Sequence, residues 1–127
     1  MVKVLIDTSI FIDFLRTGQG QFRELVQAAA RDECVLSTSS LVLFEIWQGK
    51  SMQKRPQEEK AVVVFKGIDI FPVTEAIAKM AGELSRQGEI GGIDSLIAAT
   101  ALSTKAELAT LNSRHFKNIK DLELRQP

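Results

Sequence analysis

Three carboxylates in this sequence occupy positions from which they could act together on a cation. Asp7, Glu45 and Asp94 each lie beside or within an apolar segment. Carboxylate oxygens are hard ligands that suit Mg²⁺ or Mn²⁺, whereas one cysteine and one histidine offer little for a structural zinc site. A divalent cation can lower the pKa of a bound water and neutralise charge that develops on a phosphoryl group. The three residues therefore point to metal-dependent phosphodiester chemistry.

Glu45 gives the strongest single indication of a bound cation. The other residues of the segment 41–47 are all apolar, so we expect the glutamate to be partly buried in a helix. A buried carboxylate is costly unless it is paired or bound to a cation. The positions three and four residues away on either side hold no Lys or Arg, so a salt bridge within the helix does not explain it. A metal ion is an explanation that fits.

The elements around Asp7 and Asp94 predict that both carboxylates lie at one edge of a sheet. Residues 2–6 form a short, almost wholly apolar run, as expected of a central strand, and Asp7 follows its carboxyl end. Ligands of open α/β sheets bind outside the carboxyl ends of the strands. Asp94 falls in the first turn of a helix that can begin at this edge, although an acid there also stabilises its own helix through the helix dipole.

The rest of the chain alternates short apolar strands with amphipathic helices. Strands are predicted at 2–6, 34–37, 68–73 and 107–111, with 122–125 as an optional fifth. Helices are predicted from a cap at Thr8 or Ser9 until Gly18 and Gly20 interrupt the pattern, at 20–31, 41–48 and 58–65, before Gly88, and after Gly91 and Gly92. This order predicts a three-layer α/β fold with a mainly parallel central sheet of four or five strands flanked by helices.

Composition limits how the chain could bind nucleic acid. Lys plus Arg and Asp plus Glu both number 16, so no overall positive charge draws the protein onto a polyanion. Positive charge would have to be localised, and two basic stretches allow it, unless they are ordinary solvated helix faces. These stretches are Lys50, Lys54, Arg55, Lys60 and Lys66, and Arg114, Lys117, Lys120 and Arg125.

Length and hydropathy predict a single domain over residues 1–127. No apolar run approaches the roughly 18 residues needed to cross a bilayer, and no leader peptide is recognisable, so we expect a cytoplasmic protein without membrane contact. Cys34 stands in an apolar run and is predicted to be buried packing.

Four segments resemble the motifs of PIN-domain nucleases. The opening VLIDTSIFID resembles the family's first motif, in which a strand delivers an invariant aspartate. The second, third and fourth motifs are similar to SLVLFEIWQG around Glu45, GGIDSLIAATA around Asp94, and LATLNSRHF around Asn112. The matches follow one another in the family's order along the whole chain, with the size and layout of VapC-type toxins of toxin–antitoxin pairs.

The resemblance implies a set of site residues, a reaction and partners. It implies that Asp7, Glu45 and Asp94 bind Mg²⁺ or Mn²⁺ and act in catalysis, and that Ser9 and Asn112 lie near the metal or bind substrate. It implies hydrolysis of phosphodiester bonds in RNA, often transfer RNA or messenger RNA. It also implies a homodimer and a cognate antitoxin that occupies the active-site cleft.

Two residues leave alternatives open. The family's fourth motif often has an asparagine or an aspartate at the position of Asn112. The neutral Asn112 departs from the acidic version and puts a second metal in question, although an amide can still bind a ligating water or a phosphate oxygen. His115 is either a general acid or a surface or packing residue. The alternatives to a toxin ribonuclease are a PIN-like nuclease in RNA processing or on structured DNA, and a catalytically weak module that binds RNA or protein.

Overall fold

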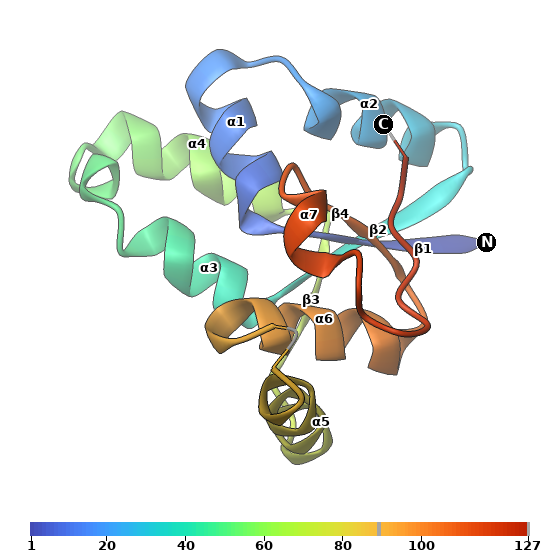
Figure 1. The fold of residues 1–127 in the computed structure, drawn as a ribbon. Coiled ribbons are helices and arrows are strands. Elements are labelled where there is room, and N and C mark those ends of the chain that lie inside the picture. Colours follow the sequence, from blue (N-terminus) through green and yellow to red (C-terminus); the bar gives the residue numbers. More distant parts are fainter. Residues whose placement is uncertain (89, 127) are drawn as a thin grey trace.

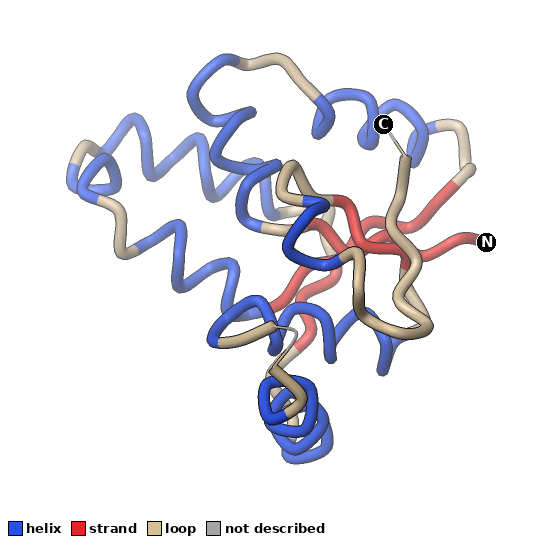
Figure 2. The backbone as a smooth tube through the Cα atoms, viewed as in Figure 1, coloured by secondary structure: helices blue, strands red, loops and turns tan. Residues whose placement is uncertain are grey.

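The computed structural model describes residues 1–88 and 90–126; Glu89 and Pro127, part of the predicted domain, lie outside the described residues. Its centre is a four-stranded sheet in the order β3-β2-β1-β4, in which all neighbouring strands are parallel (Figures 1 and 2). The strands are β1 (Val2–Ile6), β2 (Cys34–Ser39), β3 (Asp69–Phe71) and β4 (Glu107–Ala109). Because β1 pairs on both sides, its last three residues are fully buried, as the apolar run predicted.

Helices cover both faces of this sheet. Figure 1 shows α1 and α2 on one side of the strands and α5 and α6 on the other, which confirms the predicted three-layer arrangement. No helix of the described residues is long and apolar enough to span a membrane. The helices are α1 (Thr8–Thr17), α2 (Gln21–Ala30), α3 (Ser40–Trp47), the short 3₁₀ helix η1 (Lys50–Gln53), α4 (Arg55–Phe65), α5 (Glu75–Arg86), α6 (Gly92–Thr104) and α7 (Ser113–Phe116).

Three aromatic rings hold α1, α2 and α4 together above the sheet. The ring of Phe11 in α1 lies 5.3 Å from that of Phe22 in α2 and 4.5 Å from that of Phe65 in α4, measured between centroids. All three side chains are buried, and tilted aromatic pairs at such distances add to the free energy of apolar burial. This packing fixes α1, whose first residue follows Asp7.

The strand predictions were wrong in detail: β3 and β4 are shorter than the predicted 68–73 and 107–111, and two further differences have a physical reason. Residues 122–125 form no strand, because only Leu124 makes a bridge, to Leu108 of β4; the sheet of the described residues therefore has four strands. Strand β2 continues past the predicted end at Ser37, because the hydroxyls of Ser37 and Thr38 donate to carbonyls of β1, at 2.8 and 2.7 Å. Polar residues can thus be buried in a central strand at little cost.

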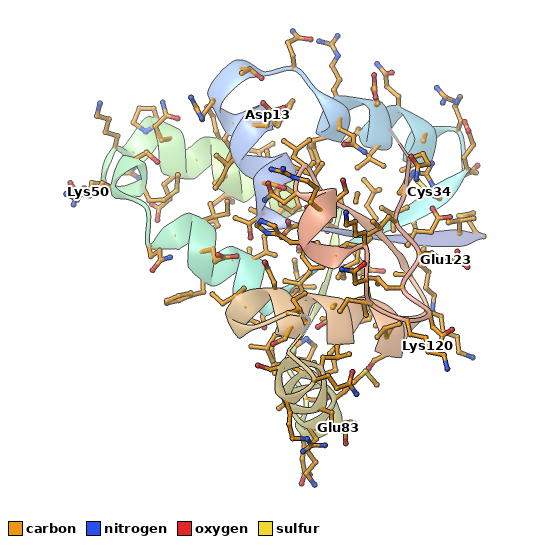
Figure 3. All side chains as sticks on the ribbon, in the orientation of Figure 1. Asp13, Cys34, Lys50, Glu83, Lys120 and Glu123 are labelled. Atoms are coloured by element: carbon orange, nitrogen blue, oxygen red, sulfur yellow. The ribbon has the colours of Figure 1, made fainter. Side chains whose placement is uncertain are left out.

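The cap of α1 also differs from the prediction. Asp7 rather than Thr8 or Ser9 is the N-cap, since its backbone is extended and its side chain accepts a hydrogen bond from the Thr8 N–H. Cys34 is buried, which confirms its predicted packing role. Figure 3 shows it near the start of β2.

The substitution Phe11→Ala should lower the free energy of unfolding by about 3–5 kcal/mol, because it leaves a cavity where α1, α2 and α4 meet. Urea denaturation followed by circular dichroism measures this loss. The control is Val63→Ala on α4, whose side chain is 65% exposed and whose loss should change stability by about 0.5 kcal/mol or less. Equal losses in the two variants would contradict the packing described here.

Candidate active site

The site is built around Asp7, at the carboxyl end of the central strand. Its residue is only 5% exposed, and both carboxylate oxygens accept hydrogen bonds. The Thr8 N–H donates to Oδ1 at 2.8 Å, and the hydroxyls of Thr110 and Ser9 donate to Oδ2 at 2.7 and 3.3 Å. Because these donors come from α1 and from the residue after β4, they fix the carboxylate relative to two neighbouring strands.

The structure links Glu45 to Asp7 through Thr8. The Thr8 hydroxyl donates to Glu45 Oε1, while the Thr8 N–H donates to Asp7. Glu45 is half-buried in α3, as its apolar neighbours predicted. Within the described residues, neither Asp7 nor Glu45 forms an ion pair with Lys, Arg or His.

Asp94 reaches the same edge of the sheet from the first turn of α6. This helix begins at Gly92, whose φ of 58° is a left-handed conformation that favours glycine. The Oδ2 atom of Asp94 lies 3.2 Å from Nδ1 of His115 in α7. Phe116, the next residue, is fully buried and anchors this short helix.

Burial raises the pKa of the Asp7 carboxyl above its ordinary value of 3.8. The hydrogen bonds from Thr110, Thr8 and Ser9 oppose this rise, whereas the negative charge of Asp94 adds to it. Asp94 is therefore close enough to act on Asp7 electrostatically. A cation between the two would remove the repulsion and favour the ionised form of Asp7.

Ser9 and Asn112, the two predicted substrate-binding residues, meet at the loop after β4. The Ser9 hydroxyl accepts from the Leu111 N–H at 3.0 Å and so holds this loop on α1. Asn112 is exposed, and its backbone N–H donates to the Thr110 hydroxyl at 3.0 Å.

Sequence reasoning did not select Thr110 and Thr8, although their hydroxyls make the shortest contacts to the predicted carboxylates. Thr110 lies 103 residues from Asp7, and Thr8 lies 37 residues from Glu45. For Thr110 the one available signal was its place two residues before Asn112 in the fourth motif. For Thr8 it was only the position directly after Asp7.

The donor set fits a hard divalent cation by its chemistry. All three candidate side chains offer carboxylate oxygens, as Mg²⁺ and Mn²⁺ prefer. In residues 1–88 and 90–126, no three Asp, Glu, His or Cys side chains are already arranged to hold one ion. Binding therefore requires side-chain adjustment, for which the partly exposed Glu45 and Asp94 leave room.

The substitution Asp7→Asn should stabilise the metal-free protein at neutral pH, and the gain should shrink as the pH is lowered. A raised pKa in the folded state means that the folded chain holds this proton more tightly than the unfolded chain. The stability it contributes is therefore complete below the ordinary carboxyl pKa and is lost as the pH rises through the raised value. Urea denaturation in chelator at several pH values measures the difference.

The control is Asp69→Asn, which removes an exposed carboxyl from β3. Its effect on stability should show little dependence on pH. If Asp7→Asn gave the same pH-independent change as Asp69→Asn, the claim that ionised Asp7 destabilises the metal-free fold would be refuted.

Comparison with known proteins identifies the family to which the chain belongs. The PIN domain family model matches residues 4–122. Ribonuclease VapC19 of Mycobacterium tuberculosis is 36% identical over 125 residues, covering 94% of this chain and 96% of the relative. Ribonuclease VapC2 of Rickettsia felis is 28% identical over 127 residues, covering 94% of each chain.

Solved structures show the same fold. VapBC2 from Rickettsia felis, bound to a DNA fragment from its promoter, matches with a TM-score of 0.86, 25% identity and 98% coverage of each chain. A toxin–antitoxin complex from Klebsiella pneumoniae matches with a TM-score of 0.74, 26% identity and 94% coverage of each chain. These matches confirm the predicted PIN-like α/β fold. The chain therefore belongs to the PIN-domain family and, within it, groups with the VapC ribonucleases.

Proposed function

We propose that this chain is an endoribonuclease that hydrolyses RNA phosphodiester bonds with Mg²⁺ or Mn²⁺, as the toxin of a toxin–antitoxin pair. The observation that carries the proposal is the buried Asp7 carboxylate, which lies near Asp94 and is linked to Glu45 through Thr8. The names of the VapC relatives support RNA as the substrate and hydrolysis as the reaction.

In this proposal Asp7, Glu45 and Asp94 hold the cation and make up the catalytic set. A bound divalent ion supplies activation of a water and neutralisation of charge on the phosphate. The Thr110 hydroxyl and the Thr8 N–H hold the Asp7 oxygens in place through hydrogen bonds. The Thr8 hydroxyl positions Glu45. Such supporting contacts preset the orientation of the ligands before substrate arrives.

Ser9 and Asn112 are proposed to serve the substrate. The exposed Asn112 amide can donate to a phosphate oxygen. Ser9 holds the loop that carries Asn112 through the hydrogen bond from Leu111. The neutral Asn112 adds no negative charge to the site, so the proposal includes one metal ion and no second one.

The proposed partners are a cognate antitoxin and a second copy of the chain in the cytoplasm, where transfer and messenger RNA are found. Solved relatives described as VapBC or toxin–antitoxin complexes support the antitoxin. In addition to the active-site cleft that the resemblance assigns to the antitoxin, an apolar cavity of about 410 Å³ between α2 and α4, lined by Val26, Val63 and other apolar side chains, suits an amphipathic segment of such a partner. Large exposed apolar side chains such as Phe44 suit a homodimer interface.

Replacing any one of the three carboxylates should abolish cleavage of transfer or messenger RNA while the fold persists. Asp7→Asn, Glu45→Gln and Asp94→Asn should each lower kcat by about 100-fold or more, the scale of losing one group that stabilises transition-state charge. End-labelled RNA and purified protein, with Mg²⁺, Mn²⁺ or chelator, give the measurement. RNA cleavage in the presence of chelator, or cleavage by all three variants, would contradict the proposal.

The matched control is Glu83→Gln on α5, which removes a carboxylate from the side of the molecule away from α1 (Figure 3). It should cleave as the unmodified chain does. Expression in a bacterial host tests the toxin role separately, since the unmodified chain should arrest growth and Asp94→Asn should not. RNA cleavage without growth arrest would remove the toxin role and leave the ribonuclease.

A further inference from the structure

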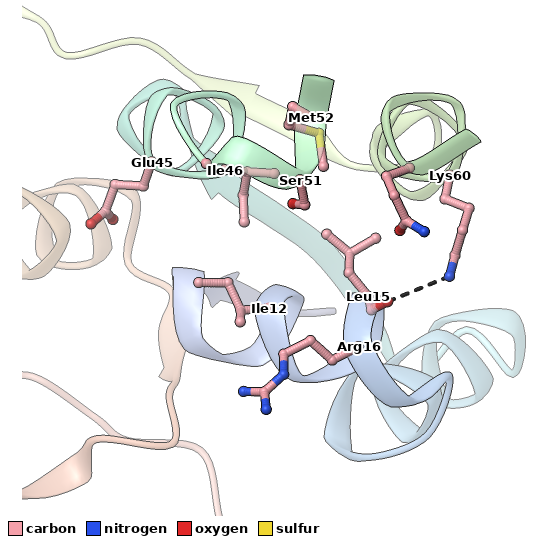
Figure 4. Close-up of a pocket in the computed structure, with 10 residues that line it drawn as sticks. Ile12, Leu15, Arg16, Glu45, Ile46, Ser51, Met52 and Lys60 are labelled. Carbon is pink, nitrogen blue, oxygen red and sulfur yellow. Dashed lines mark hydrogen bonds between the residues drawn. The ribbon is translucent and has the colours of Figure 1, made fainter. Parts of the chain in front are cut away.

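A groove leads away from the carboxylate site along one side of α1. It has a volume of about 610 Å³ and lies between α1 and the segment from α3 to α4. Figure 4 shows Glu45 at one end and Lys60 at the other, with Ile12, Ile46 and Leu15 between them. Its size lies within the roughly 300–1,000 Å³ of pockets that hold small ligands. The groove and the candidate active site therefore share Glu45.

Two cations line this groove. Arg16 comes from the last turn of α1, and Lys60 comes from α4. The Lys60 ammonium donates to the carbonyl of Leu15 at 3.4 Å, which holds it over the end of α1. Neither cation forms an ion pair with a carboxylate in the part of the chain that the structure describes. Both can therefore bind an anion.

The groove thus shows where a chain with no net charge localises positive charge. Lys60 belongs to the basic stretch 50–66 found in the sequence, and the structure sets it apart from the other members of that stretch. Lys50 lies at the outer turn of the molecule (Figure 3), and Lys66 follows the end of α4. Arg16 belongs to neither basic stretch, and only the folded chain brings it to the same groove as Lys60.

We propose that this groove holds the single-stranded RNA segment next to the cleaved bond, with Arg16 and Lys60 binding its phosphates. The inference rests on the proposed ribonuclease function. A strand whose phosphate lies at Asp7 and Glu45 continues into the groove, because Glu45 belongs to both. Guanidinium and ammonium groups bind phosphate oxygens strongly. The apolar side chains between them, Ile12 and Leu15 among them, offer a wall for base faces, as in other grooves for single strands.

RNA binding by substituted proteins tests this assignment. The probe is a short unstructured oligoribonucleotide with a fluorescent label, bound in chelator so that it is not cleaved, and followed by anisotropy over a range of salt concentrations. Arg16→Gln and Lys60→Gln should each weaken binding several-fold. Each should also reduce the slope of log affinity against log salt by about 0.7, the value for one phosphate contact on a single strand.

Matched controls lose the same amount of charge at other positions. Arg86→Gln on α5 and Lys66→Gln after α4 remove one exposed cation each outside the groove and should leave the slope unchanged. Arg16→Lys and Lys60→Arg retain the charge and should retain most of the slope. Thermal unfolding followed by circular dichroism verifies that each variant is folded.

The outcomes separate this inference from the proposed function. If Arg16→Gln and Lys60→Gln behave like the two controls, the inference is overturned; a groove that serves a protein partner instead would give this result. If they reduce the slope but the unmodified chain cleaves no RNA with metal, Arg16 and Lys60 bind RNA phosphates as proposed, and the ribonuclease proposal fails. If RNA is cleaved and the slopes do not change, the ribonuclease proposal stands and the groove assignment fails.

Discussion

The burial of one carboxylate is the constraint on which the rest of the site depends. Asp7 ends the central strand of the sheet, is almost wholly buried, and experiences the negative charge of Asp94. An ionised group in this position lowers the stability of the fold unless donors or a cation compensate it. The hydrogen bonds from Thr8, Thr110 and Ser9 supply part of that compensation. A divalent cation supplies the remainder in our account.

The same hydrogen bonds join elements that are distant in sequence. Thr8 connects α1 to α3 through Glu45, and Thr110 connects the end of β4 to the end of β1. The aromatic contacts of Phe11 in turn hold α1 against α2 and α4. One packing arrangement around α1 therefore sets the positions of the candidate carboxylates and of the walls of the groove beside Glu45. The solved structure of VapBC2 from Rickettsia felis has the same fold.

Much of the fold could be predicted because it depends on local patterns. The apolar run before Asp7, the helical spacing around Glu45 and the glycine pair before Asp94 are each visible within about ten residues. The contacts of Thr8 and Thr110 could not be predicted, since they join residues that only the folded chain brings together. Burial of Ser37 and Thr38 in β2 depends likewise on carbonyls of the neighbouring strand. Arg16 gave no signal in the sequence, because its place on the same groove as Lys60 is a tertiary feature.

Calorimetric titration of the purified, metal-free protein with Mn²⁺ at neutral pH tests the central claim most directly. We expect saturable Mn²⁺ binding by the unmodified chain and by Glu83→Gln, together with a rise in the unfolding temperature as Mn²⁺ is added. Asp7→Asn should lose both the binding and the rise. Equal Mn²⁺ affinity in Asp7→Asn and the unmodified chain, or no binding by either, would contradict the claim that the buried carboxylate is kept to hold a cation.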